Sequence, residues 1–422
     1  IAMNARFTPA LFAHAEAVLG LVLRFEYPAD AVVSRYFRDH HQLGHADRAF
    51  VAETVFAVLR RGRSIEARCA GRLSDRNRLL VALAVTRGWS QRELAPVLKA
   101  SEIDWLAAAR SMAEEDFPPA VRCDLPDWLY DRLEAQFGAD EVLRLAAALN
   151  QPAPLDLRVN TLKTNRAALL AQFAAEGIAA VPGSLSPLAI RLRDKPALAR
   201  HPLFLGGAFE VQDEGSQLLG YLLEPRRGEM VVDFCAGAGG KTLLLGALMK
   251  NTGRLYAYDV SDKRLARLKP RLARSGLSNV HPVRIEHERD VRIKRLAGKV
   301  DRVLVDAPCS GLGTLRRNPD LKWRQGEDAV AELAVKQAAI LDAAARLVCP
   351  GGRVVYATCS LLTAENESVV DAFLAGHPEF TLMPASAVLA KQGIALAGDF
   401  LRLLPHQHNT DGFFAAILDR KA

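Results

Sequence analysis

The sequence predicts an α/β protein in which a mostly parallel sheet follows an all-α domain and a small α+β connecting region. Residues 1–145 show apolar residues at helical spacing, with few glycines and prolines. The turn-rich stretch Asn150–Pro154 breaks this pattern. After residue 229, short apolar strands alternate with helical segments, an order typical of a parallel sheet with helices on both faces. We therefore expect an all-α region 1–145, an α+β region 146–225 and an α/β region 226–422.

The all-α prediction rests most clearly on residues 47–60. Apolar side chains recur there at helical spacing, at Phe50, Val51, Val55, Val58 and Leu59. Asp47 stands at the start of this run and is the candidate N-cap. We expect a helix that begins at Asp47 and turns its apolar side toward a core.

Strand candidates follow in order along the rest of the chain. Two lie in the connecting region, Leu155–Val159 and Ala189–Leu192. Five lie in the last region: Met230–Phe234, Leu255–Tyr258, Val303–Val305, Val354–Ala357 and Phe413–Leu418. The clearest helix between them has its apolar positions from Val330 to Ala344. This alternation predicts a doubly wound sheet, in which ligands sit at the carboxyl ends of the strands.

Composition places the chain among ordinary globular proteins. Of its 422 residues, 50% are hydrophobic and 24% are charged, which argues against long disorder. Lys and Arg exceed Asp and Glu by 55 − 48 = 7, which suits a polyanion partner without proving one. No apolar run is long enough to span a membrane and no secretory signal is evident, so we expect a cytoplasmic protein. The six scattered cysteines include no CxxC pair, which argues against disulfides and against a metal site.

A glycine-rich loop follows the strand candidate that begins at Met230. It consists of Cys235, Ala236, Gly237, Ala238, Gly239, Gly240 and Lys241. A P-loop needs glycine where Cys235 stands, and the dinucleotide fingerprint needs glycine where Thr242 stands. The third interpretation is an S-adenosylmethionine site, which tolerates a looser glycine-rich turn.

An acid at the end of the next strand candidate supports this third interpretation. Asp259 stands 19 residues after Gly240, where a carboxylate can accept hydrogen bonds from both ribose hydroxyls. The alternative is that Asp259, or Ser261 after it, only caps the following helix. The distance to the glycine loop favours ribose binding.

A second acid and two thiols follow two further strand candidates. Asp306 and Cys309 follow Val303–Val305, and Cys359 follows Val354–Ala357. All three should therefore face the same ligand as the glycine loop. Methylation of carbon 5 of a cytosine needs such a set, because a thiolate that adds to carbon 6 makes carbon 5 nucleophilic. A carboxyl group assists at ring nitrogen 3, and a base then removes the proton from carbon 5. These residues do not by themselves rank the two thiols.

Several separate motifs over residues 150–420 carry a family resemblance. Besides the glycine loop, they are Leu157–Leu162, Val211–Gln217, Asp306–Gly311, Arg317–Trp323, Ala357–Ser360, Leu404–His406 and Asp411–Phe414. Together they resemble the RsmB/Sun (Fmu) branch of the NSUN-type RNA 5-methylcytosine methyltransferases. In the glycine loop the family usually has Ala-Pro where this chain has Gly237-Ala238. The resemblance implies a class I (Rossmann-like) S-adenosylmethionine-dependent methyltransferase domain and, through residues 1–145, a NusB-like RNA-binding domain.

The resemblance also implies roles for individual residues. Cys359 would attack the base, and Cys309 would help to release the product. Residues 235–241, Asp259 and Asp306 would hold S-adenosyl-L-methionine, with Asp306 also near the target base. The family has a further acid that contacts the adenine side of the cofactor, and among the candidates in Glu286–Asp290 we favour Asp290.

Basic residues near the proposed site are the expected RNA contacts, namely Arg316, Arg317 and Lys241. Two further basic clusters, in residues 263–274 and 292–299, fit a solvated helix face as well as they fit RNA. Trp323 fits stacking on a base or packing in a core.

These observations predict an S-adenosylmethionine-dependent RNA (cytosine-5)-methyltransferase that acts on 16S (small-subunit) rRNA. A base splayed from a single strand or loop would reach the thiol. One alternative is the same chemistry on tRNA or another rRNA cytosine. Others are a non-catalytic RNA-binding factor and a nicotinamide-dependent dehydrogenase, which the broken dinucleotide fingerprint disfavours. We expect a monomer without a metal.

Overall fold

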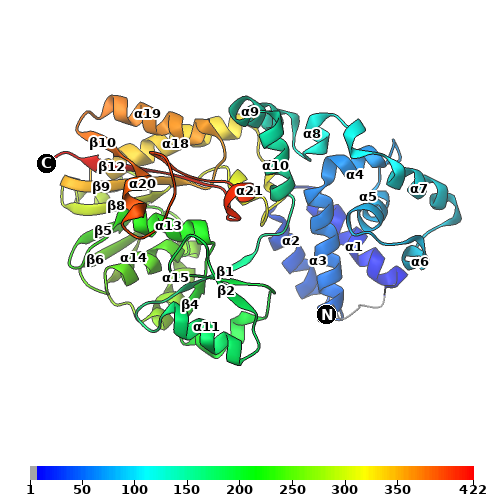
Figure 1. Ribbon diagram of the computed structural model, residues 1–422, viewed down its shortest axis with the longest axis horizontal. Helices are drawn as coiled ribbons and strands as arrows, with labels where there is room; N and C mark the ends of the chain where they lie inside the picture. Colours follow the sequence, from blue (N-terminus) through cyan, green and yellow to red (C-terminus); the bar gives the residue numbers. More distant parts are fainter. Residues whose placement is uncertain (1–6) are drawn as a thin grey trace. The chain divides into compact units, whose positions relative to one another are not determined.

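The computed structural model describes residues 7–422, which form two compact units (Figure 1). Unit 1 contains the described residues up to Pro152 and the segment Thr314–Glu327. Unit 2 contains Ala153–Gly313 and Asp328–Ala422. Residues 314–327 were expected in the α/β region, but in the structure this segment packs with unit 1, because Trp323 joins the apolar core of that unit.

In the described residues of unit 1, all the regular secondary structure is helical. Its longer helices are α1 (Pro9–Val22), α2 (Ala29–Asp39), α3 (His45–Arg60), α4 (Gly62–Arg68), α5 (Asp75–Val81), α7 (Ile103–Ser111), α9 (Asp127–Phe137) and α10 (Ala139–Leu149). Short helices are α6 (Gln91–Leu94), α8 (Pro119–Arg122), α17 (Leu321–Arg324) and a π-helical turn at Ala82–Thr86. Helices α1, α3 and α5 share one apolar core, which includes Leu19, Val55 and Leu79. A NusB-like fold for this unit stays a prediction.

Helix α3 confirms the helical prediction for residues 47–60 but not its start. The helix begins at His45, and Gly44 rather than Asp47 is the N-cap. Asp47 lies in the first turn, where its Oδ2 accepts a hydrogen bond from Gly44 N at 3.2 Å. The prediction of Asp47 as the N-cap was therefore wrong by three residues, because acids are favoured both at the cap and in the first turn of a helix.

Unit 2 begins with a small antiparallel sheet of strand order β2-β3-β1-β4. Its strands are β1 (Leu155–Val159), β2 (Ala180–Pro182), β3 (Ala189–Leu192) and β4 (Phe209–Val211). The helix α11 (Arg166–Ala175) buries Leu169 and Phe173 against β1 and β3, while the short α12 (Pro202–Leu205) lies next to β4. The predicted strands Leu155–Val159 and Ala189–Leu192 are confirmed as β1 and β3.

The large sheet of unit 2 is mixed. Along the path β10-β12-β9-β8-β5-β6-β7, the five strands from β9 to β7 are parallel. The strand β12 is antiparallel to β9, and β10 and β11 are antiparallel to β12. The bounds are β5 (Met230–Asp233), β6 (Arg254–Asp259), β7 (Val280–Arg284), β8 (Val300–Asp306), β9 (Val348–Thr358), β10 (Phe380–Met383), β11 (Leu401–Leu403) and β12 (Phe413–Arg420).

Helices cover both faces of this sheet, as a doubly wound sheet requires. Alternate residues of β5 show the division, since Val231 packs into one apolar core and Val232 into the other. The core of Val231 includes α13 (Glu214–Leu223), α14 (Gly240–Leu248) and α20 (Ala385–Ala390), whereas that of Val232 includes α18 (Glu327–Ala345) and α19 (Glu367–Gly376) (Figure 1). The remaining helices are α15 (Asp262–Ser275), α16 (Val291–Lys294) and α21 (Pro405–His408). In residues 7–422, none of the helices combines the length and apolarity needed to cross a membrane.

Candidate active site

The predicted site residues of unit 2 follow neighbouring parallel strands at their carboxyl ends. The glycine loop follows β5, Asp259 ends β6, and Asp306 ends β8. Cys359 comes directly after β9. Because β9, β8, β5 and β6 are adjacent in the sheet, their carboxyl ends form one continuous edge. The order of the strands thus brings together residues that are up to 124 positions apart, 359 − 235.

The two thiols are in contact. Cys309 Sγ and Cys359 Sγ lie 3.3 Å apart, and neither is part of a disulfide. The interaction with Cys359 and burial both raise the pKa of the Cys309 thiol well above its ordinary value. Cys309 therefore holds its proton at neutral pH, in contact with the sulfur of Cys359.

Lys241 and Asp306 form an ion pair beside these thiols. Lys241 Nζ donates to Asp306 Oδ2 at 2.7 Å and lies 5.8 Å from the centre of the Phe413 ring. Burial acts to lower the pKa of Lys241, but the charge and the hydrogen bond of Asp306 outweigh it and raise the pKa. The charge of Cys359 acts in the same direction. Lys241 is therefore a cation held by the carboxylate of Asp306.

The glycine loop needs its glycines for backbone conformation and for space. Gly237 and Gly239 have φ of 57° and 83°, a region that favours glycine. A Cβ on Gly239 would lie 2.1 Å from Leu268 Cδ1 of α15. The loop also turns on itself, since Gly239 N donates to Ala236 O at 2.8 Å.

Two arginines hold this loop in place, namely Arg158, for which no role was predicted, and Arg271, which belongs to the basic cluster of residues 263–274. The fully buried Arg158 donates to Gly240 O at 2.6 Å, and Arg271 donates to Ala238 O at 2.7 Å. Glu210 fixes Arg271 and Arg274 together, at 2.9 and 2.7 Å. Arg158 falls within a family motif, which was the only sequence signal for it.

Of the two roles that the sequence left open, helix capping and ribose binding, the structure shows the cap, and Ser261 rather than Asp259 provides it. Ser261 Oγ caps α15 by accepting from Arg264 N at 3.3 Å. Asp259 instead accepts from Gly237 N through Oδ2 and from Ser261 N through Oδ1, both at 2.8 Å. Asp259 thus links the glycine loop to the end of β6, and its contact with a ribose stays a prediction.

Asp290 is the N-cap of the short helix α16. Its Oδ2 accepts from Glu286 N at 2.9 Å, and its Oδ1 accepts from Arg292 N at 2.8 Å. These backbone hydrogen bonds lower the pKa of Asp290 to about 2. Asp290 is therefore ionised at neutral pH, and its contact with the cofactor stays a prediction.

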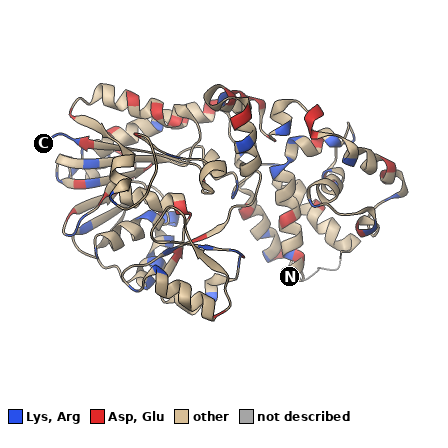
Figure 2. Ribbon diagram, in the orientation of Figure 1, with Lys and Arg blue, Asp and Glu red and all other residues tan. Residues whose placement is uncertain are grey.

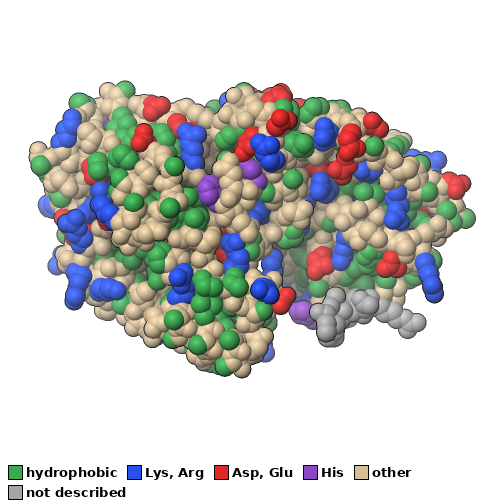
Figure 3. All heavy atoms as spheres, in the orientation of Figure 1, with side chains coloured by type: hydrophobic (Ala, Val, Ile, Leu, Met, Phe, Trp, Pro, Cys, Tyr) green, Lys and Arg blue, Asp and Glu red, His purple; other side chains and the backbone are tan. Residues whose placement is uncertain are grey.

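The predicted RNA contacts fall into different parts of the structure. Arg316 and Arg317 lie on the segment that packs with unit 1, where Arg60 Nη2 donates to Arg316 O at 3.3 Å. The Lys and Arg residues of α15 are blue in Figure 2, but its Arg271 and Arg274 form ion pairs with Glu210. On the face seen in Figure 3, Lys and Arg of unit 2 occupy several separate places rather than one stripe. RNA binding by these residues stays a prediction.

Trp323 packs in the core of unit 1. Its Nε1 donates to Leu59 O at 2.8 Å, and its ring contacts the apolar cluster of the unit. Among residues 7–422, no three His, Cys, Asp or Glu side chains are grouped in a way that could hold a metal ion.

Comparison with known families places two segments of the chain. Residues 220–419 match the family described as 16S rRNA methyltransferase RsmB/F. Residues 125–198 match the family described as the ferredoxin-like domain of RsmF/B-like methyltransferases. The second match overlaps the small antiparallel sheet that starts at β1.

Curated relatives and solved structures agree with these matches. A probable ribosomal RNA small subunit methyltransferase B of Synechocystis sp. is 32% identical over 93% of this chain and 95% of its own length. The probable enzyme of the same name from Bacillus subtilis is 36% identical over 72% of this chain and 68% of its own. The crystal structure of PH0851 has a TM-score of 0.78 at 28% identity and covers 97% of this chain and 98% of its own. A methyltransferase homologue from Pyrococcus horikoshii has a TM-score of 0.62 at 29% identity, over 76% of this chain and all of its own.

Proposed function

The chain belongs to the RsmB/F family of 16S rRNA methyltransferases, and we propose that it methylates carbon 5 of a cytosine in small-subunit rRNA, with S-adenosylmethionine as the methyl donor. The observation that carries this proposal is the contact between the two thiols next to the Lys241–Asp306 pair, at the ends of adjacent strands. A single buried cysteine is ordinarily a small apolar side chain. Two cysteines in contact beside a fixed cation and a carboxylate are a reactive set.

The residues around the glycine loop fit S-adenosylmethionine. Gly237 brings bare backbone to the strand ends, and nothing lies within 4 Å of the place that a Cβ on it would take, which leaves room for a ligand. Val260 and Val291 follow Asp259 and Asp290 directly, and their side chains are 51% and 61% exposed, unusual for valine and suited to an adenine ring. We propose that these residues hold the cofactor, which would supply the electrophilic methyl group that carbon 5 accepts.

The chain's own residues account for the chemistry on the base. Cys359, as the thiolate, forms a bond from sulfur to carbon 6, and the electron pair displaced from the ring makes carbon 5 nucleophilic. Asp306 and Lys241 lie beside this sulfur, where they can hold a proton and a positive charge against ring nitrogen 3. After methylation the proton on carbon 5 must leave and the bond between carbon 6 and sulfur must break. Cys309, 3.3 Å from Cys359, is the group placed to assist that release.

Transfer of tritiated methyl groups from S-adenosylmethionine to unmodified small-subunit rRNA tests the proposal. Wild type should label the RNA, and digestion to nucleosides should place the label in 5-methylcytidine. Cys359→Ala should be inactive. Cys349→Ala is the matched control, because Cys349 lies at the opposite end of the same strand β9 and contacts Asp301.

Three outcomes of this assay separate the proposal from its alternatives. Label in tRNA but not in rRNA would keep the chemistry and refute the substrate. Full activity of Cys359→Ala would refute the role of that thiol. Label in no RNA at all would favour a non-catalytic RNA-binding factor.

A further inference from the structure

A buried carboxylate, that of Glu365, lies close to the loops that carry the two thiols, and the proposed reaction gives it no role. Glu365 ends a short turn (Thr363–Glu365) that follows the Cys359 loop, and its side chain is completely buried. A carboxylate in such a place is costly unless hydrogen bonds stabilise it. The hydrogen bonds that Glu365 makes therefore have to account for its burial.

Glu365 binds the residue that follows each thiol. Ser310, next to Cys309, donates to Glu365 twice, from its backbone N at 2.8 Å and from its Oγ at 2.6 Å. Ser360, next to Cys359, donates its Oγ to the same carboxylate. The two hydroxyls also lie 3.2 Å from each other. One side chain thus joins two loops that are 50 residues apart in the chain.

The carboxylate is itself fixed from two other elements. Gln337 Nε2 of α18 donates to Glu365 Oε1 and to Pro308 O, both at 3.0 Å. Tyr356 Oη of β9 donates to the backbone oxygen of Glu365 at 2.6 Å. All these donors are uncharged, so the negative charge of Glu365 is stabilised by hydrogen bonds rather than by an ion pair.

We propose that Glu365 is a positioning residue for the reaction: it ties the Cys309 loop to the Cys359 loop, keeps the two sulfurs in contact, and directs a negative charge at Cys309. The charge of Glu365 adds to Cys359 and to burial in raising the pKa of Cys309. Tyr356 also interacts with Cys309, and its own pKa is raised by burial and by Cys309. The inference rests on the proposed roles of the thiols. It concerns how Glu365 holds the two thiol loops together and why the pKa of Cys309 is raised.

Phenylarsine oxide measures the thiol contact without RNA. It forms two S–As bonds with a pair of close thiols, and its oxygen leaves as water with the two thiol protons. We expect wild type to bind it through Cys309 and Cys359, as mapped by mass spectrometry. Glu365→Ala removes the tie between the loops and should weaken binding at least about tenfold, because the second bond loses its high effective concentration.

Two further variants separate the hydrogen bonds by which Glu365 joins the loops from the effect of its negative charge. Glu365→Gln keeps an acceptor for Ser310 N and Gln337 and offers an N–H₂ to the two hydroxyls, so arsenical binding should stay as in wild type. The loss of charge should lower the midpoint of Cys309 alkylation by iodoacetamide by about one pH unit. Glu367→Gln is the matched control, because it removes an equal charge two residues away that pairs with Arg402.

The results decide the inference as follows. A folded Glu365→Ala that binds phenylarsine oxide like wild type overturns it. If Glu365→Ala does not fold, an unchanged Cys309 midpoint in Glu365→Gln overturns it. In the methylation assay, Glu365→Ala should lower kcat and leave KM for RNA unchanged, whereas a residue that only supports the fold would lower the amount of active protein. Arsenical binding and thiol alkylation need no RNA. These measurements therefore test the inference even if the chain does not methylate rRNA.

Discussion

Asp233 is a buried carboxylate beside the candidate site with few hydrogen bonds to stabilise its charge. It ends β5 directly before the glycine loop and is 1% exposed. Thr242 Oγ1 donates to its Oδ2 at 2.7 Å, but its Oδ1 has no hydrogen-bond partner in the described structure. Burial raises the pKa of Asp233 to about 7. Asp233 therefore carries a proton in the folded protein at mildly acidic pH.

This pKa predicts how stability changes with pH. The unfolded chain loses the proton of Asp233 near its ordinary pKa of about 3.9, whereas the folded protein keeps it up to about pH 7. The contribution of this group is thus greatest at low pH and falls as pH rises between these values. Asp233→Asn, which cannot ionise, should be more stable than wild type at pH 8, by up to roughly 3 kcal/mol, and closer to it at pH 5. Urea unfolding at both pH values measures this, and an equal difference at pH 5 and pH 8 would contradict it.

Some residues of the candidate site could be predicted from the sequence, and others could not. Asp259, Asp306, Cys309 and Cys359 could be predicted together, because each stands at the end of an apolar run and parallel strands end on one edge. Glu365 could not, because nothing in its neighbourhood in the chain shows that Ser310 will meet it. Side chains that act by joining distant loops need the tertiary structure before they can be recognised.

Between elements, the close approach of two glycines fixes the backbone at Cys359. Gly313 N donates to Cys359 O at 2.8 Å, and Gly412 N donates to Gly313 O at 2.8 Å. A Cβ on Gly313 would lie 2.2 Å from Gly412 O and 2.7 Å from Cys359 O. The Asp411–Phe414 motif at the start of β12 therefore has a structural reason, since its glycine lets the chain pass against the thiol loop.

Gly313→Ala should displace the Cys359 loop. No flexible side chain can give way, because the atoms nearest the added Cβ are backbone oxygens. A shift of about 1 Å at a reacting group can lower the rate about 100-fold, so we expect methylation to fall by roughly that factor. Gly376→Ala is the control, because a Cβ there meets nothing within 4 Å. Near-normal activity of Gly313→Ala, assayed as tritiated methyl transfer, would show that the loop tolerates the shift.

Most elements of unit 2 could be predicted because their apolar runs are short and bounded by turns. The predicted strand at Val354–Ala357 is the inner part of β9, whose first residues contain Pro350, Gly351 and Gly352. These residues are typical of a turn, and they hid the early part of the strand. The strand β7 was missed for a related reason, since its residues are largely exposed and include Pro282. An edge strand with a polar, proline-containing sequence gives little periodic signal.

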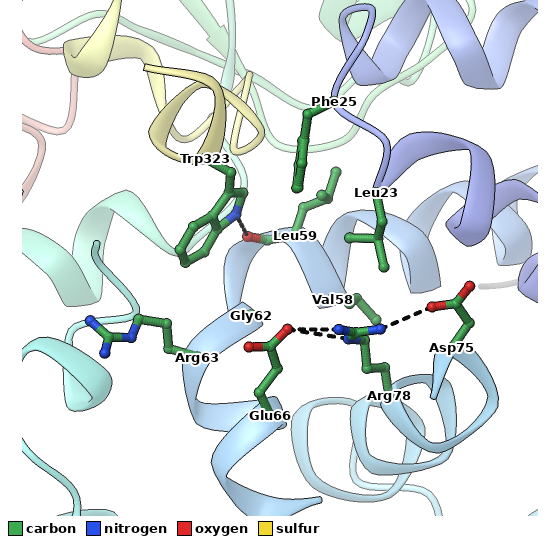
Figure 4. Close-up of a pocket in the computed structure, with 10 residues that line it drawn as sticks. All are labelled: Leu23, Phe25, Val58, Leu59, Gly62, Arg63, Glu66, Asp75, Arg78 and Trp323. Carbon is green, nitrogen blue, oxygen red and sulfur yellow. Dashed lines mark hydrogen bonds and ion pairs between the residues drawn. The ribbon is translucent and has the colours of Figure 1, made fainter. Parts of the chain in front are cut away.

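At the scale of the whole molecule, one segment crosses from the sequence of unit 2 into the fold of unit 1. The chain leaves unit 2 after Gly313 and returns at Asp328. Trp323 of this segment lines a cavity of about 340 Å³ in unit 1 with Phe25, Leu59 and Gly62, while Arg78 joins Glu66 and Asp75 on another side of the cavity (Figure 4). The segment is therefore part of the core of unit 1.

The indole of Trp323 should stabilise unit 1 in two ways that substitutions can separate. Trp323→Phe keeps an aromatic ring but loses the N–H that Leu59 O accepts, which should cost about 1 kcal/mol. Trp323→Ala also removes the packing and should cost about 3 kcal/mol or more. Val335→Ala, at a side chain that is 75% exposed, is the control. Unfolding followed by circular dichroism measures these differences, and a Trp323→Ala variant as stable as wild type would contradict the core role.

The segment also carries a buried lysine with a pH-dependent effect. Lys322 Nζ donates to Arg60 O at 2.8 Å and to Asn150 Oδ1 at 3.0 Å, and burial lowers its pKa to about 7. The unfolded chain keeps this proton up to about pH 10.4, so the folded state is penalised below pH 7 and recovers between the two values. We expect Lys322→Met to reduce the gain in unit 1 stability between pH 7 and pH 9. An identical gain in wild type and variant would show that Lys322 does not titrate there.

In the reaction that we propose, Cys359 bonds to the base and Cys309 is needed to release it. Its most direct test is denaturing electrophoresis of Cys309→Ala after incubation with S-adenosylmethionine and unmodified small-subunit rRNA. We expect a covalent protein–RNA adduct that wild type does not accumulate and that disappears in the double variant Cys309→Ala/Cys359→Ala. An adduct that persists in the double variant, or that forms in Cys359→Ala but not in Cys309→Ala, would contradict it.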